Sequence, residues 1–192
     1  HMKKAIVLSL VSLMLLGLAA CSGSADQTAS AAPAASSDQP IRLARMAAAP
    51  HGTRSFAVIV VALQGDTIVG VSLDEYQFMS TDVAVGVPNS DAVDEGGLGS
   101  NYADPTVVLG SKRENTDYYS SHMAEAAGAT VPIDENYDAI EAHVTGMTVA
   151  ELEEEVNGFS SGEDAIDAVS GATLADTRGY LEAILETAKS GS

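Results

Sequence analysis

Ser55–Leu63, with the sequence SFAVIVVAL, decides the fold of this chain of 192 residues. The segment is apolar at nearly every position, which is typical of a central strand that is covered on both faces. Gln64-Gly65-Asp66 follows as a turn, and in Thr67–Leu73 an apolar residue returns at every second position from Val69 onward. Alternation of this kind favours a strand with one buried face. The two segments therefore predict a β-hairpin.

After the hairpin the pattern changes from loop to helix. Residues 79–115 are polar and rich in glycine, and a stretch of this length usually forms binding loops or a flap. Apolar residues then recur at helical spacing, and Thr148-Val149-Ala150-Glu151 is a capping box. Because strands come first and helices later, we predict an α+β fold, with the N-terminal β-hairpin in a small antiparallel sheet packed with C-terminal helices. The expected helices cover residues 116–128, 133–144, 148–158, 163–169 and 174–189.

The first 21 residues have the pattern of a lipoprotein signal peptide, and we interpret His1 as a cloning remnant. Lys3 and Lys4 precede the apolar run Ala5–Leu16, which is shorter than the roughly 20 residues that a bilayer span needs. The run leads to Leu18-Ala19-Ala20-Cys21, which resembles the bacterial lipobox, whose cysteine receives a diacylglycerol. A plain signal peptide or an anchor helix is the alternative. We expect a chain held by acyl groups such as palmitate on the extracytoplasmic face of the cell membrane.

Composition divides the remaining chain into a tether and a domain. Residues 22–54 are rich in Ala, Ser and Pro and predict a flexible tether. Residues 55–192 contain 4 Lys and Arg against 25 Asp and Glu, a net charge of −21. Such a surface excludes nucleic-acid binding and favours basic partners, although a solvated surface alone would also explain many of the acids. No cysteine follows Cys21 and the histidines lack ligand spacing, so we expect no metal site.

The segment Asp167–Thr173, with the sequence DAVSGAT, carries the most specific chemistry. It resembles the flavinylation signature of the FMN-binding domain family, Asp-x-x-Ser/Thr-Gly-Ala-Thr/Ser. That family includes the C subunit of the sodium-pumping NADH:quinone reductase, the G subunit of the Rnf complex and lipoproteins of extracellular electron transfer. The likeness covers about residues 55–189 and includes residues 74–78, 86–91, 101–104 and 109–113.

The resemblance implies a covalent cofactor on Thr173. In the family, an FAD:protein FMN transferase moves FMN from FAD onto the last hydroxyl of the signature, and AMP leaves. Gly171 and Ala172 are small enough for the transferase to close over the loop. Ser170 is expected to cap a helix or bond the phosphate, and Asp167 to be read by the transferase. A helix that starts at Leu174 would place the phosphate at its N-terminus.

The alternative is that this segment has a structural role alone, as a turn between helices. Thr130 and Thr148 end two similar stretches, but both lack the aspartate six residues before the threonine, and Thr148 is already explained as a cap. The full signature therefore favours Thr173.

The function implied by the resemblance is that of an electron carrier, not of an enzyme. Its partners would be the transferase and redox donors and acceptors, either proteins or quinone. The acidic surface is expected to lower the flavin potential. A module that binds flavin or another ligand without covalent attachment or redox role is the alternative, and a structural lipoprotein is the third. With no Trp in the chain, aromatic contacts to the flavin would come from Tyr or Phe, with Tyr76, Tyr102, Tyr118 and Tyr119 as candidates.

Overall fold

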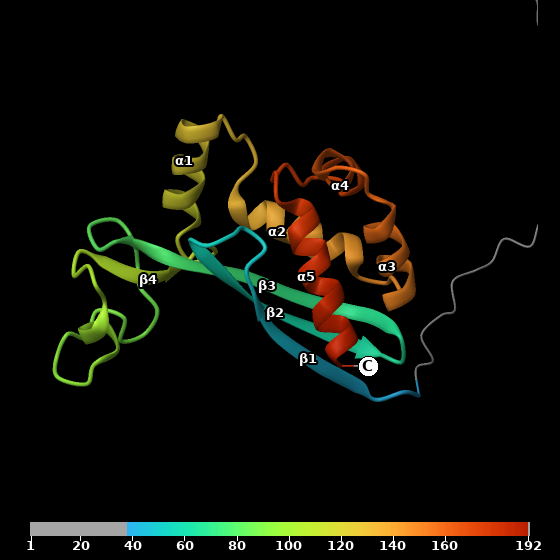
Figure 1. Ribbon diagram of the computed structural model, residues 1–192, viewed down its shortest axis with the longest axis horizontal. Helices are drawn as coiled ribbons and strands as arrows, with labels where there is room; N and C mark the ends of the chain where they lie inside the picture. The colour runs from blue at the N-terminus through green and yellow to red at the C-terminus, as the bar shows by residue number, and fades with distance from the viewer. Residues whose placement is uncertain (1–37, 192) are drawn as a thin grey trace, which may run out of the picture. The chain divides into compact units, whose positions relative to one another are not determined.

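The computed structural model describes residues 38–191, which form a four-stranded antiparallel sheet followed by five helices (Figure 1). Cys21, the predicted signal peptide and residues 22–37 of the predicted tether lie outside the described residues. The strand order is β1-β2-β3-β4. The predicted α+β class, with its β-hairpin in a small antiparallel sheet, is confirmed. The elements are β1 (Ile41–Ala48), β2 (Ser55–Gln64), β3 (Thr67–Ser80), the 3-10 helix η1 (Leu98–Asn101), β4 (Val107–Ser111), α1 (Thr116–Ala127), α2 (Ile133–Val144), α3 (Val149–Gly158), α4 (Gly162–Ala168) and α5 (Thr177–Ser190).

The prediction of a tether through residue 54 is wrong for β1. This strand pairs antiparallel with β2 along its whole length, from Ile41 opposite Gln64 to Ala48 opposite Ala57. Its sequence, IRLARMAA, contains three alanines and two arginines and buries only Ala44, so composition carries no strand signal. Pairing with β2 decides its structure instead, because the edge of β2 offers a row of backbone N–H and C=O groups to a neighbouring strand.

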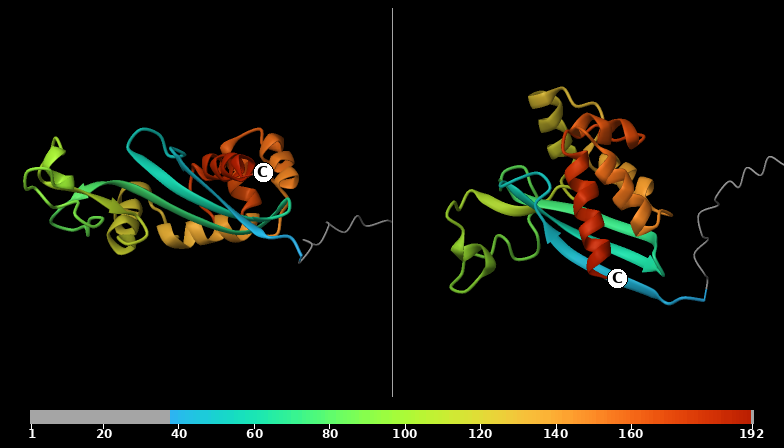
Figure 2. Two further views of the ribbon diagram at one scale, coloured as in Figure 1. Left: turned by 90° about the horizontal axis from the view of Figure 1, so that it is seen from below. Right: turned by 45° about the vertical axis from the view of Figure 1, so that its right-hand side comes forward.

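The core lies on one face of the sheet, against α2 and α5. Residues of β2 alternate, so that Ile59 and Val61 are fully buried whereas Val58 and Val60 are only partly buried. The prediction that β2 is covered on both faces is therefore wrong, and its outward valines reflect strand propensity more than burial. α5 lies across β1 and β2 (Figure 2) and α2 packs on β3. Together the helices contribute Tyr137, Ile140, Leu181 and Ile184 to this core.

Local signals fix most helix ends. The predicted capping box at Thr148 is present, with Glu151 bonding back to the Thr148 amide. Gly128 ends α1 in the left-handed conformation, at φ 67°, as glycine permits. α5 begins at Thr177 and not at Leu174, because the carbonyl of Leu174 accepts from both the amide and the hydroxyl of Thr177 and closes a turn there.

Two strands lie at the ends of the segment predicted to be loop. β3 continues to Ser80, and β4 pairs with its last residues, from Tyr76 opposite Ser111 to Ser80 opposite Val107. Residues 81–106 between them hold only η1 as regular structure. Among residues 38–191, no helix is both long and apolar enough to cross a membrane.

A single buried alanine tests whether β1 belongs to the domain. Ala44 is 5% exposed on the inner face of β1, and Ala47 is exposed on the outer face of the same strand. Ala44→Asp places a carboxylate against the core and should cost about 2–3 kcal/mol, which lowers the melting temperature by roughly 5–10 °C. Ala47→Asp is the matched control and should change it little. Equal melting curves for both variants in circular dichroism would mean that residues 41–48 are a tether after all.

Candidate functional site

The DAVSGAT segment forms the end of α4 and the turn that leads toward α5. Val169 and Ala172 are buried and anchor the turn, and the amide of Ala172 donates to the carbonyl of Val169 at 3.1 Å. Gly171 has φ +95°, a conformation that other residues rarely adopt, and a Cβ there would lie 3.3 Å from the Cβ of Ala139. The glycine of the signature is therefore required by the backbone, and the turn brings Thr173 to an exposed position.

Thr173 is held by one buried side chain from α2. Asn136 is fully buried, and its Oδ1 accepts from the amide of Thr173 at 2.7 Å and from the hydroxyl of Thr173 at 3.3 Å. The amide group of Asn136 donates in turn to the carbonyls of Val131 and Pro132 at 3.1 and 2.9 Å. Asn136 thus ties the turn to the N-terminus of α2 and orients an exposed hydroxyl.

The other predicted residues of the signature lie as follows. Asp167, on the last turn of α4, and Ser170 are both exposed, so each is accessible to a second protein. Because α5 begins at Thr177, with Asp176 as its N-cap, the prediction of a phosphate at a helix start at Leu174 is wrong. Ser170 caps no helix for the same reason.

An apolar hollow of about 170 Å³ is lined in part by the two residues that follow Thr173 in the chain. Leu174 and Ala175 form one side, and α1 forms another through Tyr119 and Met123. Its lining also includes two residues that carry hydrogen-bond donors, Lys112 and Tyr180. Its full lining is His51, Lys112, Tyr119, Met123, Ala127, Ile133, Leu174, Ala175, Asp176 and Tyr180.

A buried polar cluster around Glu75 lies behind this hollow. The Glu75 carboxylate is fully buried, and its Oε2 accepts from the Lys112 ammonium group, from the Tyr137 hydroxyl at 3.1 Å and from the Tyr180 hydroxyl at 3.0 Å. Its Oε1 accepts from the Ser55 hydroxyl at 3.0 Å. Four donors from four segments satisfy one carboxylate, as a buried charge requires.

The two tyrosines of the Glu75 cluster are donors over the whole ordinary pH range. Burial, and then the neighbouring hydroxyl and the Glu75 carboxylate, raise the pKa of Tyr137 far above its ordinary value. Burial and the Glu75 carboxylate likewise raise the pKa of Tyr180. Both hydroxyls therefore keep their protons and continue to stabilise the charge on Glu75.

Two lining residues of the hollow, His51 and Asp176, contact each other through their side chains. His51 Nδ1, in the loop between β1 and β2, lies 2.6 Å from Asp176 Oδ2. The two side chains are 41% and 43% exposed, so water screens this pair much more than the buried pair of Lys112 and Glu75.

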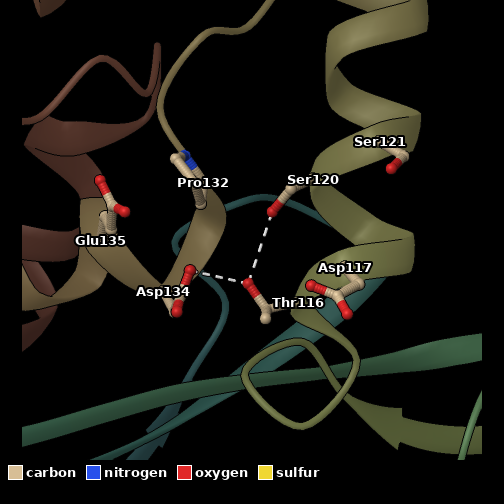
Figure 3. Close-up of a pocket in the computed structure, with 7 residues that line it drawn as sticks. All are labelled: Thr116, Asp117, Ser120, Ser121, Pro132, Asp134 and Glu135. Carbon is tan, nitrogen blue, oxygen red and sulfur yellow. Dashed lines mark hydrogen bonds between the residues drawn. The ribbon is translucent and has the colours of Figure 1, made fainter.

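A larger hollow between α1 and α2 has a different chemistry (Figure 3). It measures about 480 Å³ and is lined by Thr116, Asp117, Ser120, Ser121, Pro132, Asp134 and Glu135. The Thr116 hydroxyl donates to Asp134 at 2.7 Å, and this bond holds the pKa of the Asp134 carboxyl below its ordinary value. Three carboxylates make this hollow unsuited to a phosphate or to an apolar ring.

Only one of the four candidate tyrosines lies beside the turn. Tyr119 lines the apolar hollow, whereas the ring of Tyr118 stacks on His122. Tyr76 stacks on Phe56 from the neighbouring strand, and Tyr102 packs against Phe78.

The sequence reasoning missed four residues of the site, namely Glu75, Lys112, Asn136 and Tyr180. All four are polar and cannot be told from surface residues by sequence. One signal could have pointed to Lys112, which is one of only four Lys and Arg residues after residue 54.

Thr130 and Thr148, which end the two similar stretches, lie outside this turn. Thr130 is exposed in the connection between α1 and α2, and the Thr148 hydroxyl is occupied by Glu151 in the capping box. Within residues 38–191, no group of three or more His, Cys, Asp or Glu side chains is arranged to hold a metal ion.

Comparison of this chain with protein-family models, with curated proteins and with solved structures found no match.

Proposed function

We propose that this protein is a membrane-anchored, extracytoplasmic flavoprotein that carries electrons on an FMN esterified to Thr173. The observation that carries the proposal is the setting of that hydroxyl. It is exposed on a glycine turn, oriented by the buried Asn136, and followed directly by an apolar hollow. A modifying enzyme needs this kind of accessible hydroxyl on a loop of small residues.

The residues of the site fit an esterified FMN. Esterification replaces the hydroxyl proton of Thr173, but the amide of Thr173 keeps its 2.7 Å bond to Asn136, so the turn stays in place. The phosphate would remain in solvent at the exposed threonine. The isoalloxazine ring would lie in the apolar hollow against Leu174, Tyr119 and Tyr180. The bound cofactor supplies the redox chemistry, and the chain positions it.

Covalent attachment accounts for the hollow better than reversible binding of FMN does. A protein that holds free FMN must bind its phosphate, usually with cations or a helix N-terminus. The lysine and the histidine of the lining are already occupied by acidic partners, Lys112 by Glu75 and His51 by Asp176. An ester to Thr173 needs no phosphate site. A module that binds flavin or another flat ligand without an ester remains the second candidate, because the hollow alone would suit it.

The proposed partners follow from the same reading. The FAD:protein FMN transferase would act on the exposed turn, and the protein itself would be an electron carrier and not an enzyme. Donors and acceptors would be redox proteins or quinone near the membrane. The net charge of −21 on residues 55–192 favours protein partners with a basic face.

The first test is covalent attachment. Co-expressed with an FMN transferase in the presence of FAD, the protein should gain the mass of one FMN less one water, as measured by intact mass spectrometry. Thr173→Ala should abolish the gain because it removes the acceptor oxygen, and Thr173→Ser should retain it.

Thr130→Ala and Thr148→Ala are the matched controls for that test. Both should keep the full gain, although Thr148→Ala also loses a helix cap and about 1 kcal/mol of stability. Flavin on the Thr173→Ala protein would refute the assignment, and a wild-type protein that binds flavin without a change in mass would favour the reversible module.

The second test concerns the anchor. In cells that process lipoproteins, the protein should incorporate a clickable fatty acid and fractionate with membranes, because the Cys21 thiol is the expected acceptor of the lipid. Cys21→Ser should lose the label and accumulate as the unprocessed precursor. Labelling that survives in the Cys21→Ser protein would show that the lipobox assignment is wrong.

A further inference from the structure

The hollow next to Thr173 includes a lysine in its wall that is both buried and paired. The side chain of Lys112 is 1% exposed, and its Nζ donates to the fully buried carboxylate of Glu75. The same Nζ lies 4.5 Å from the centre of the Tyr119 ring, which also lines the hollow. Lys112 belongs to the lining of the hollow and Glu75 does not. Of the two charged residues, the lysine is therefore the one that borders the space.

This pair is not needed to join the strands that carry it. β3 and β4 are already paired through their backbones from Tyr76 to Ser80, and the amide of Lys112 donates to the carbonyl of Glu75 at 2.8 Å. A buried ion pair loses several kcal/mol of hydration per ion, and well-packed apolar side chains often give equal stability. What the pair adds is a fixed positive charge in the wall of an apolar hollow.

We propose that Lys112 is the residue that sets the reduction potential of the flavin on Thr173, and that Glu75 holds it in place and moderates its effect. This inference rests on the proposed function. Reduction adds two electrons from a redox donor and one proton from solvent, so the ring gains one negative charge and no bond of the protein changes. A cation in the wall of the hollow stabilises that added charge and raises the potential.

The other charged groups around Lys112 oppose this effect only weakly. Glu75 lies farther from the hollow, and the hydroxyls of Tyr137 and Tyr180 both donate to its carboxylate and spread its charge. His51 and Asp176, which also line the hollow, form an exposed pair that water screens. Lys112 is therefore the charge that acts on the ring through the least solvent.

The test compares midpoint potentials of flavinylated proteins, measured by spectroelectrochemical titration. Glu75→Gln leaves Lys112 without its counter-charge and should raise the potential. The double variant Glu75→Gln with Lys112→Gln removes both charges and should have a potential below that of the wild type. Each step should change the ratio of reduced to oxidised flavin at fixed ambient potential by about tenfold, the effect of a unit charge within about 6 Å of a titrating group.

A second Lys–Glu pair provides the matched control. Lys189 near the end of α5 bonds to Glu153 on α3, and both side chains are 44% exposed. Figure 1 shows that the C-terminal end of α5 lies away from the loop that joins α4 to α5. Glu153→Gln with Lys189→Gln makes the same change of charge there and should leave the potential unchanged.

A third arm tests whether the ring lies in the hollow. Ala127 is an exposed residue of α1 that lines it, so Ala127→Phe should fill the space and displace the ring. In that background the potentials of the Glu75 and Lys112 variants should converge. Ala124→Phe, at an exposed alanine of the same helix outside the lining, should leave the differences intact.

The outcomes separate the two proposals. If the mass of the wild-type protein shows no esterified FMN, the proposed function fails. If FMN is attached but the potentials do not follow the order Glu75→Gln, wild type, double variant, the role of Lys112 is refuted. Should the double variant not fold, Lys112→Gln alone decides, because it removes the cation itself, and an unchanged or higher potential contradicts the proposal.

Discussion

The rest of this structure depends on the burial of one carboxylate. Glu75 is fully buried. A buried carboxylate without partners loses several kcal/mol of hydration free energy, which destabilises the folded state. The fold meets this demand with Ser55 at the start of β2, Lys112 just after β4, Tyr137 on α2 and Tyr180 on α5. These hydrogen bonds fix the position of the helices relative to the sheet. Apolar packing, which has no preferred direction, does not do so alone.

The same constraint places the candidate site. Tyr137 donates to Glu75, and its neighbour Asn136 accepts from Thr173, so a single turn of α2 fixes both the core and the exposed threonine. Tyr180 lies in the first turn of α5, so its bond to Glu75 also fixes where that helix starts and how the preceding turn runs. The hollow lies between these points, and its shape follows from the cluster behind it.

Sequence periodicity was enough to predict the hairpin, the helices and the capping box, because apolar spacing reports which face of an element is buried. It failed for β1, whose alanines and arginines carry no such pattern. It also failed for the start of α5, because Leu174 fits the apolar spacing of that helix although a turn separates the two. The signature predicted an acceptor hydroxyl on Thr173, and the structure places that threonine exposed on a glycine turn. Glu75 was beyond reach, since one buried acid among 25 looks like the surface acids that surround it. Asn136 looked like the polar face of its helix.

The buried pair also changes what the acidic composition implies for a flavin at this site. A net charge of −21 on residues 55–192 suggests a low potential, but those acids lie mostly at the surface, where salt screens them beyond about 10 Å at 0.1 M. Lys112 acts through protein interior, where the effective dielectric constant is several times lower than in water and Coulomb energies are correspondingly larger. Even partly offset by Glu75, a cation close to the proposed flavin would outweigh many distant anions that salt screens. In the proposed flavoprotein, the surface charge would therefore act mainly on which partners approach, and the buried charge on the energy of the transferred electrons.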